Sequence, residues 1–289
     1  MNRFLELLEH RSVLVADGAT GTNYQAMGLP PGTAPEEWLF DASEHVVTLH
    51  RAFVDAGSDL ILTDTFGATP LRLQHTPLAG RVRDVNVRAV ELAREAAGGR
   101  ALVAGSMGPT GHLFEPLGPL TRGECVDNYQ QQAAALAEGG ADLLVLETFF
   151  ALDEALAAVE GTRRSSDLPL VVSFSFDQGT RTMMGLSPAD VAEAFVPLEV
   201  AAIGANCGKS LESADVVAAE LLDKAGATPV WLKPNAGVPK IVGDAVVYEA
   251  GPETLAAHAR RYAEQGARVV GGCCGSTPEH VTAIVGAVR

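Results

Sequence analysis

Two adjacent cysteines near the C-terminus are the residues of this sequence with the clearest potential for chemistry. Cys273 and Cys274 lie in Gly271-Gly-Cys-Cys-Gly275, directly after a short apolar run. Thr277 as an N-cap and Pro278 at the first helical position predict that a helix starts next. We therefore expect both thiols where a buried strand passes into a helix, which is where α/β proteins collect their active-site residues.

The same pair has plainer interpretations. Free cysteine is among the most buried residue types, so Cys273 and Cys274 could simply be small core residues. A vicinal disulfide is disfavoured by ring strain and by a reducing compartment. Adjacent side chains of a regular strand point to opposite faces, so the two thiols converge only if the backbone departs from the pleat. The three flanking glycines permit that departure, because glycine adopts conformations that other residues avoid.

Short β-branched apolar runs alternate with helical patterns eight times along the 289 residues. The expected strands are Val13–Ala16, Leu60–Thr63, Ala101–Gly105, Leu143–Leu146, Leu170–Phe174, Ala202–Ala205, Val230–Leu232 and Arg268–Val270. The expected helices are Glu44–Ala56, Arg81–Ala97, Arg122–Glu138, Leu152–Arg164, Pro188–Val196, Leu211–Lys224, Pro252–Gln265 and Pro278–Val288. Nearly continuous apolar strands indicate a parallel sheet covered on both faces. Eight β-then-α units predict an α/β fold with one (β/α)8 TIM barrel over residues 1–289. An open doubly wound sheet would not need eight units, and no GxGxxG follows the first strand.

In such a barrel the residues that follow the strands build the active site. Small, polar and thiol residues occupy most of these positions: Asp17 and Gly18 after the first strand, Asp64 after the second, Ser106 after the third, Glu147 after the fourth, Asn206 and Cys207 after the sixth, and Lys233 after the seventh. Cys207 is thus expected on the same barrel mouth as Cys273 and Cys274. Cys125 falls within the predicted helix Arg122–Glu138 and is expected to pack there.

Three thiolates at one mouth are a suitable ligand set for a catalytic zinc ion with an open fourth position. Soft sulfur ligands favour zinc over magnesium or calcium. A thiol that binds such an ion is deprotonated outright, and the thiolate is the nucleophilic form. The predicted site would therefore present a substrate thiolate for attack on a methyl group that bears a good leaving group.

Composition excludes several other classes of protein. The net charge of −15 argues against nucleic acid or an anionic membrane as the main partner. The N-terminal ten residues are charged and amphipathic, without the apolar core of a signal peptide, and no apolar run is long enough to span a membrane. Four cysteines at these spacings do not form a secreted disulfide framework. A cytoplasmic location is the prediction.

Six short motifs resemble those of the homocysteine S-methyltransferase family, in the same order and over nearly the whole chain. They are Asp17-Gly-Ala-Thr-Gly-Thr22, Thr65-Phe-Gly-Ala68, Leu146-Glu-Thr148, Gly204-Ala-Asn-Cys207, Pro234-Asn-Ala-Gly237 and Gly271-Gly-Cys-Cys-Gly275. The family includes the homocysteine module of cobalamin-dependent methionine synthase and betaine–homocysteine methyltransferase. The resemblance implies a (β/α)8 barrel, a zinc ion, and Cys207, Cys273 and Cys274 as its catalytic ligands. It also implies that Asp17, Gly18 and Glu147 hold the amino-acid end of homocysteine.

Three of these polar residues also have structural interpretations. Glu147 could pair with a substrate ammonium, or be a buried carboxylate satisfied by the backbone or by an arginine. Asp17 lies in a glycine-rich turn open to a ligand, although Asp-Gly is also a common turn pair. Asn206 could support a metal-bound thiolate from outside the ligand set, or be a turn residue.

The methyl donor is less well defined by the sequence. A betaine donor needs an aromatic cage around its quaternary ammonium, but Gly67 follows Phe66 and Thr148 follows Glu147, where that branch has tyrosines. A partial cage remains conceivable from a set of four aromatic residues: Trp38, Phe66, Phe149 and Phe150.

The segments Pro234-Asn-Ala-Gly-Val-Pro239 and Arg181-Thr-Met-Met-Gly185 resemble the methionine synthase module more closely. They imply either a separate corrinoid protein or a sulfonium such as S-methylmethionine as donor. Asp64 stands where relatives more often have asparagine, and a carboxylate facing the mouth could favour a cationic donor. The segment Gly237–Gly243 is expected to be an extended loop that acts as a lid or a partner surface.

Two other functions remain open from the sequence alone. The barrel could bind a thiol amino acid without turning it over. Lys233 could act as a Schiff-base lysine in an aldolase-like reaction, but that interpretation leaves the cysteines unexplained.

Overall fold

The computed structural model describes residues 2–242 and 245–289, and eight parallel strands form its centre. Their order around the sheet is β1-β10-β7-β6-β5-β4-β3-β2. The strands are β1 (Leu14–Val15), β2 (Leu60–Leu62), β3 (Leu102–Met107), β4 (Leu143–Phe149), β5 (Leu170–Phe174), β6 (Ala202–Cys207), β7 (Val230–Pro234) and β10 (Val269–Val270). A bridge between Ala16 and Leu60 joins β1 to β2, so the sheet closes on itself. The predicted TIM barrel is confirmed.

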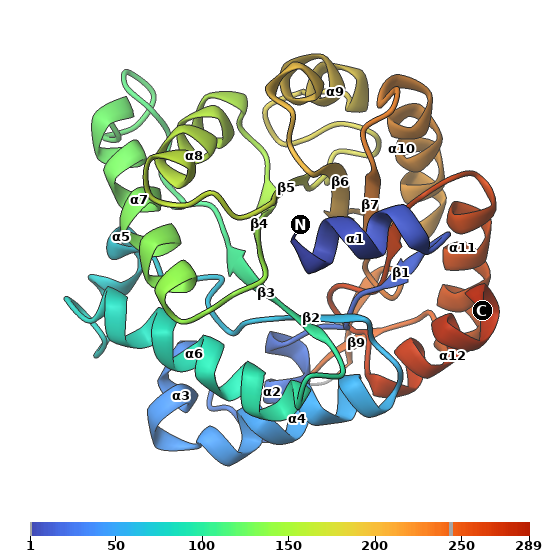
Figure 1. Ribbon diagram of the computed structural model, residues 1–289, viewed down its shortest axis with the longest axis horizontal. Coiled ribbons are helices and arrows are strands. Elements are labelled where there is room, and N and C mark those ends of the chain that lie inside the picture. Colours follow the sequence, from blue (N-terminus) through green and yellow to red (C-terminus); the bar gives the residue numbers. More distant parts are fainter. Residues whose placement is uncertain (1, 243–244) are drawn as a thin grey trace.

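Eight helices cover the outside of the barrel, each within one residue of its predicted bounds (Figure 1). They are α4 (Ser43–Asp55), α6 (Val82–Ala97), α7 (Arg122–Glu138), α8 (Leu152–Ser165), α9 (Pro188–Phe195), α10 (Leu211–Lys224), α11 (Pro252–Glu264) and α12 (Pro278–Val288). Shorter elements not anticipated from the sequence are α1 (Arg3–His10), α2 (Gly21–Ala26), η1 (Pro35–Glu37), α3 (Trp38–Asp41), α5 (Pro70–Leu73) and η2 (Val196–Leu198). Among the described residues, no helix is both long and apolar enough to cross a bilayer.

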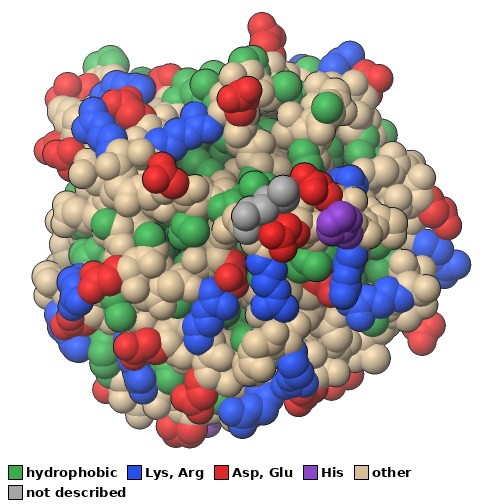
Figure 2. Space-filling model, viewed as in Figure 1, with side chains coloured by type: hydrophobic (Ala, Val, Ile, Leu, Met, Phe, Trp, Pro, Cys, Tyr) green, Lys and Arg blue, Asp and Glu red, His purple; other side chains and the backbone are tan. Residues whose placement is uncertain are grey.

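The N-terminal helix α1 closes one end of the barrel. Phe4 and Leu8 of this helix join the apolar cluster formed by inward-facing strand residues such as Leu60 and Trp231. Asn2, just before the helix, donates a hydrogen bond to the carbonyl of Asp142 at the start of β4. Figure 1 shows α1 lying across the barrel axis, and Figure 2 shows basic and acidic side chains interspersed on this face. Helix α1 therefore covers the end of the barrel where the strands begin, opposite the end where they finish.

Strands β3, β4, β6 and β7 run further toward that end than the sequence predicted. Strand β4 includes Glu147, β6 includes Asn206 and Cys207, and β7 includes Lys233. These side chains therefore stand on hydrogen-bonded strands and not on loops, because the ladders between β4, β5, β6 and β7 continue past the apolar residues.

The segment after β7 is a hairpin and not the extended loop predicted for Gly237–Gly243. Strands β8 (Pro239–Val242) and β9 (Ala245–Tyr248) pair antiparallel, apart from the barrel. Gly243 lies outside the described residues. The β-branched and aromatic residues of this stretch are strand formers, and their two short runs pair with each other.

Candidate metal and substrate site

Three cysteines converge at the carboxyl ends of the strands. Cys207 is the last residue of β6, and Cys273 and Cys274 follow β10. Their three sulfur atoms all lie within 4.8 Å of one another, and the sulfurs of Cys207 and Cys273 are 3.0 Å apart. All three residues are half-buried, whereas Cys125 is fully buried in the packing between α7 and its neighbours. The pair is therefore part of a three-sulfur cluster, and Cys125 is a core residue.

Asn206 holds the strained backbone beside this cluster. Cys207 and Thr148 both have positive φ, of 57° and 65°, a conformation that costs a non-glycine residue free energy. The Asn206 amide oxygen accepts from the Thr148 backbone N–H at 2.8 Å, and its Nδ2 donates to the Thr148 hydroxyl at 2.6 Å. The same Nδ2 lies 3.6 Å from the sulfur of Cys207 and 3.9 Å from that of Cys273. Asn206 thus fixes the strand ends and faces two of the three sulfurs.

The glycines around the cysteine pair are required by close contacts. A Cβ at Gly272 would lie 2.3 Å from the hydroxyl oxygen of Ser276, and that hydroxyl donates to the carbonyl of Cys273 at 2.6 Å. A Cβ at Gly275 would lie 2.1 Å from Cγ of Tyr248. The Cys274 backbone N–H donates to Oδ1 of Asn235 at 3.0 Å. The loop therefore turns the two neighbouring thiols to the same side, which a regular strand could not do.

The cluster stabilises one negative charge. Hydrogen bonding from the Cys207 thiol lowers the pKa of Cys274 to about 3. The same network, through the hydrogen bond to Cys273, raises the pKa of Cys207. Three sulfur donors that share charge in this way form a soft, anionic ligand set, which fits zinc and similar ions better than magnesium or calcium.

A buried ion pair lies beneath the sulfurs inside the barrel. Nζ of Lys233 is 2.7 Å from Oδ1 of Asp17, and the two side chains are 3% and 1% exposed. Oδ2 of Asp17 accepts from the backbone N–H of Leu62 at 2.8 Å. Burial by itself would lower the pKa of Lys233, but the charges of Asp17 and Glu147 outweigh it and raise the pKa.

This ion pair corrects two predictions. Asp17 is not open to a ligand, because both of its carboxylate oxygens have partners within the protein. Lys233 stays protonated, and a protonated amine is not a Schiff-base nucleophile. The aldolase-like interpretation of Lys233 therefore loses its support.

Glu147 projects from β4 toward the same interior. The Ser106 hydroxyl donates a hydrogen bond to it. Burial raises the pKa of Glu147 to about 7, and the charge of Lys233 opposes that rise. Glu147 is half-buried, so it is the acidic side chain of this group that a ligand can still reach.

Gly18 lies close beside the loop Gly271–Ser276, which carries Cys273 and Cys274 and is called the cysteine loop below. A Cβ at this position would be 2.7 Å from a ring carbon of Phe53 and 2.8 Å from the carbonyl oxygen of Ser276. No larger residue fits without moving the backbone that follows the cysteine pair.

Known proteins are similar to this chain both in sequence and in fold. A family model described as homocysteine S-methyltransferase matches residues 14–288. The chain belongs to the homocysteine S-methyltransferase family. It is 33% identical to methionine synthase of Mycobacterium leprae (strain TN) and 32% identical to that of Mycobacterium tuberculosis (strain ATCC 25618 / H37Rv). Each alignment is 303 residues long, gaps included. These matches cover 98% of this chain and 25% of either relative, so the chain spans about a quarter of their length.

A solved structure of similar length matches nearly end to end. The metallated form of the homocysteine methyltransferase MmuM from Escherichia coli superimposes with a TM-score of 0.82 at 25% identity. The match covers 96% of this chain and 97% of that one. The apo form of the same protein matches with a TM-score of 0.77 at 24% identity. The predicted family is confirmed, and with it the assignment to a family of methyltransferases.

Asp64 does not face the open mouth of this family member. It is 4% exposed, and its Oδ2 has no hydrogen-bond partner among the described residues. Burial, and next the charge of Glu36, raise its pKa well above the usual value. Glu36 in turn accepts a hydrogen bond from the backbone N–H of Gly67 at 2.6 Å. Asp64 therefore belongs to a buried acidic pair, contrary to the prediction of an exposed carboxylate.

Replacement of Asp64 by asparagine should change how stability depends on pH. A carboxyl whose pKa is higher in the folded than in the unfolded state stabilises the fold at low pH, and this contribution is lost as pH rises through the folded pKa. We therefore expect Asp64→Asn to lose less stability than the parent between pH 5 and pH 8 in urea unfolding. Asp127→Asn, at a carboxylate that is 71% exposed, is the matched control. Parallel profiles for the parent and Asp64→Asn would contradict the assignment.

The aromatic residues proposed for a donor cage are mostly in the core. Phe149 is fully buried between Tyr129 and Phe174, with ring centroids 5.8 and 6.5 Å away. Trp38 is 8% exposed and packs on Tyr24, with ring centroids 5.0 Å apart. Of the four, Phe66 and Phe150 are half-buried. Two of the four residues left open as a partial cage, Phe149 and Trp38, are thus part of the core.

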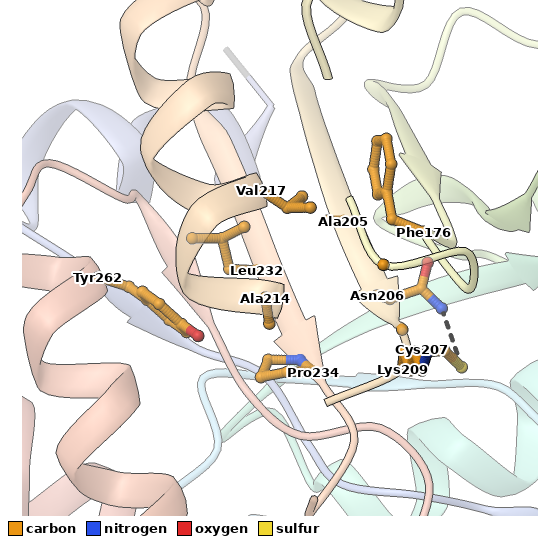
Figure 3. A pocket seen from close by; sticks show the side chains of 12 residues that line it. Phe176, Ala205, Asn206, Cys207, Lys209, Ala214, Val217, Leu232, Pro234 and Tyr262 are labelled. Atoms are coloured by element: carbon orange, nitrogen blue, oxygen red, sulfur yellow. Dashed lines mark hydrogen bonds between the residues drawn. The ribbon is translucent and has the colours of Figure 1, made fainter. Parts of the chain in front are cut away.

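A small apolar cavity lies behind Cys207, on the helix-facing side of β6. Its volume is about 20 Å³, and its lining includes Ala205, Val217 and Leu232. Figure 3 shows Val217 and Leu232 on one side, and Asn206 with its contact to Cys207 on the other. A space of this size holds about one water molecule, so it is not a substrate pocket.

Two residues beside the cysteines, Asn235 and Tyr248, have no chemical signal of their own in the sequence. Asn235 stands within one of the six motifs. Nothing local in the sequence marks Tyr248, because its role depends on a hairpin that folds back over Gly275.

Proposed function

We propose that this chain is a zinc-dependent methyltransferase that moves a methyl group to the thiolate of homocysteine, forming methionine. The observation that carries the proposal is the cluster of three sulfurs within 4.8 Å at the strand ends of the barrel. Cys207, Cys273 and Cys274 would hold the ion, which supplies a fourth position where a substrate thiol is ionised. The metallated form of MmuM, a homocysteine methyltransferase, supports a metal in this family.

The polar residues of the barrel would bind the amino-acid end of the substrate. Glu147 is the proposed partner of the ammonium group, because it is the reachable carboxylate beside the sulfurs. Asp17 would act through Lys233, whose ammonium group donates a hydrogen bond to the Asp17 carboxylate at 2.7 Å. Gly18 would contribute through its backbone, since Phe53 and the carbonyl of Ser276 already fill the space that a side chain would occupy. Asn206 would position Cys207 and donate to the metal-bound sulfurs.

Two kinds of donor remain in the proposal. One is a methylated corrinoid protein, in keeping with the similarity to methionine synthases. The other is a small donor, such as the sulfonium S-methylmethionine. The buried positions of Phe149 and Trp38 count against betaine. The cytoplasm stays our proposed location, because the four cysteines do not form a secreted disulfide framework.

A donor panel tests the proposal directly. The purified protein should contain about one zinc per chain and convert homocysteine to methionine, detected by mass, with one donor among methylcobalamin, S-methylmethionine, S-adenosylmethionine and betaine. Protein without zinc, whose thermal unfolding is unaffected by homocysteine, would overturn it. Zinc and homocysteine binding without methyl transfer from any donor would instead favour a thiol amino-acid binding module.

The pH dependence of homocysteine binding tests the role of Glu147. Since the pKa of Glu147 is raised to about 7, it loses its negative charge below that pH and with it the attraction for an ammonium group. Affinity should fall as pH decreases from 8 to 6. Glu147→Gln should weaken binding at pH 8 by at least about tenfold, as expected for a lost charge-assisted hydrogen bond, and should flatten this fall. Glu138→Gln, at an exposed carboxylate, should bind as the parent does.

A further inference from the structure

The hairpin β8–β9 brings one side chain back toward the sulfur cluster. In its register Tyr248 is opposite Pro239, and Val246 is opposite Ile241. Residues opposite each other share a face of an antiparallel pair, as do alternate residues of a strand, so all four side chains lie on one face. Ile241 is 83% exposed and Val246 is 54% exposed. Ile241 and Val246 are therefore in solvent, while Tyr248 at the base of the hairpin meets the barrel.

The base of the hairpin and the cysteine loop form one hydrogen-bonded unit. The backbone N–H of Ala236 donates to the carbonyl of Cys274 at 2.9 Å, and the N–H of Ala250 donates to the carbonyl of Ala236 at 3.0 Å. The N–H of Cys274 donates to the side chain of Asn235. These bonds join the two ends of the hairpin to each other and join its first end to Cys274. The backbone therefore fixes the place of Tyr248 relative to Cys274.

The ring of Tyr248 rests directly on Gly275. The position of a Cβ at Gly275 is 2.1 Å from Cγ and 2.5 Å from Cβ of the tyrosine. Gly275 directly follows Cys274, so the phenol lies beside that thiol, and the two side chains are within hydrogen-bond reach of each other.

Hydrogen-bond donors approach the three sulfurs from two sides. From within the barrel, Nδ2 of Asn206 lies within 3.9 Å of the sulfurs of Cys207 and Cys273. Cys274 has no such contact with Asn206 among the described residues, and Tyr248 lies beside it from the hairpin. A sulfur ligand needs hydrogen-bond donors to moderate its negative charge.

We infer that Tyr248 is a positioning residue of the site, whose hydroxyl donates a hydrogen bond to the sulfur of Cys274. This inference rests on the proposed function, because it assigns Tyr248 a role toward the zinc that the three cysteines would hold. A hydrogen bond to a thiolate ligand reduces the charge that the sulfur gives to the ion. The acceptor thiol at the fourth position then ionises at a lower pH than it would without Tyr248.

Replacement of the hydroxyl alone tests this role. In zinc-loaded Tyr248→Phe we expect a chelator to remove the metal about tenfold faster than from the parent, as for other lost outer-shell partners. The pH at which homocysteine binding is half-maximal should rise by about one unit, equivalent to one charge-assisted hydrogen bond. In the cobalt-substituted protein the sulfur-to-metal charge-transfer band should move to lower energy, because the sulfur of Cys274 donates more charge.

Two further variants separate the hydroxyl from the ring and from the hairpin. Val247→Ala changes the neighbouring side chain, which lies on the other face of β9 and is 47% exposed, and should match the parent in all three measurements. Tyr248→Ala removes the ring as well and should show at least the changes of Tyr248→Phe. If Tyr248→Phe matches the parent, the inference is wrong, whatever Tyr248→Ala does.

The parent protein separates this failure from a failure of the proposed function. A parent that binds zinc and homocysteine, with a Tyr248→Phe variant indistinguishable from it, overturns only the role of Tyr248. A parent that binds neither overturns the proposed function, and the role of Tyr248 with it.

Discussion

Cys207→Ser is expected to abolish zinc binding and methyl transfer together. The serine hydroxyl stays protonated at neutral pH and is a poor ligand for zinc, so two sulfurs remain where three are needed. We expect the zinc content to fall from about one per chain to near zero and methionine formation to fall at least about 10³-fold. Metal analysis and mass detection of methionine measure both quantities on the same sample.

Cys125→Ser is the matched control, because its thiol is buried in α7 and distant from the cluster. It should cost some stability while the zinc content stays the same. If Cys207→Ser retained a full complement of zinc, or if Cys125→Ser lost it, the three-sulfur site would be assigned wrongly.

Lys233→Met should destabilise the protein more than any other single change at the barrel mouth. The substitution keeps the length of the side chain but leaves Asp17 at 1% exposure without its counter-ion. Breaking a buried pair by removing one partner costs roughly 3–5 kcal/mol. Urea unfolding at pH 7 should show a loss of this size.

A double variant identifies the cause of that loss. Asp17→Asn combined with Lys233→Met removes both charges and should recover a large part of the stability lost in Lys233→Met. Arg83→Met, which breaks an exposed pair with Glu138, should cost less than about 1 kcal/mol. Equal losses in the buried and exposed variants would contradict the importance of burial at Lys233.

The convergence of the sulfurs could be predicted from sequence because it depends only on strand order. Once eight β-then-α units are recognised, the ends of β6 and β10 must lie on one mouth, which brings Cys207 near Cys273. The helices were equally well marked, since their caps and their apolar periodicity are local signals. The ends of β4, β6 and β7 were not, because backbone pairing there continues through polar residues that carry no strand signal.

The environments of the acidic residues could not be predicted in the same way. The sequence shows that Asp17 and Asp64 follow strands, but not what lies against each carboxylate. Asp17 is paired with Lys233, which is 216 positions away in the chain. Asp64 lies beside Glu36, and Glu36 belongs to a short helix that has no apolar periodicity. Contacts of this kind depend on how loops fold over the barrel, as does the return of Tyr248 to Gly275.

The arrangement of the sulfurs also bears on how the barrel stays closed. β10, the strand before Cys273, has two residues and pairs on one side with β1, which has two as well. Cys207 stands on β6, two strands away, and 66 positions separate it from Cys273. An ion held between them would tie the end of β10 to the end of β6 across β7. It would limit the unfolded chain as a disulfide does, by roughly 4 kcal/mol for a loop of this length. Loss of the metal would then also destabilise the fold. The three proposed catalytic ligands would thus also hold the last strand of the barrel in place.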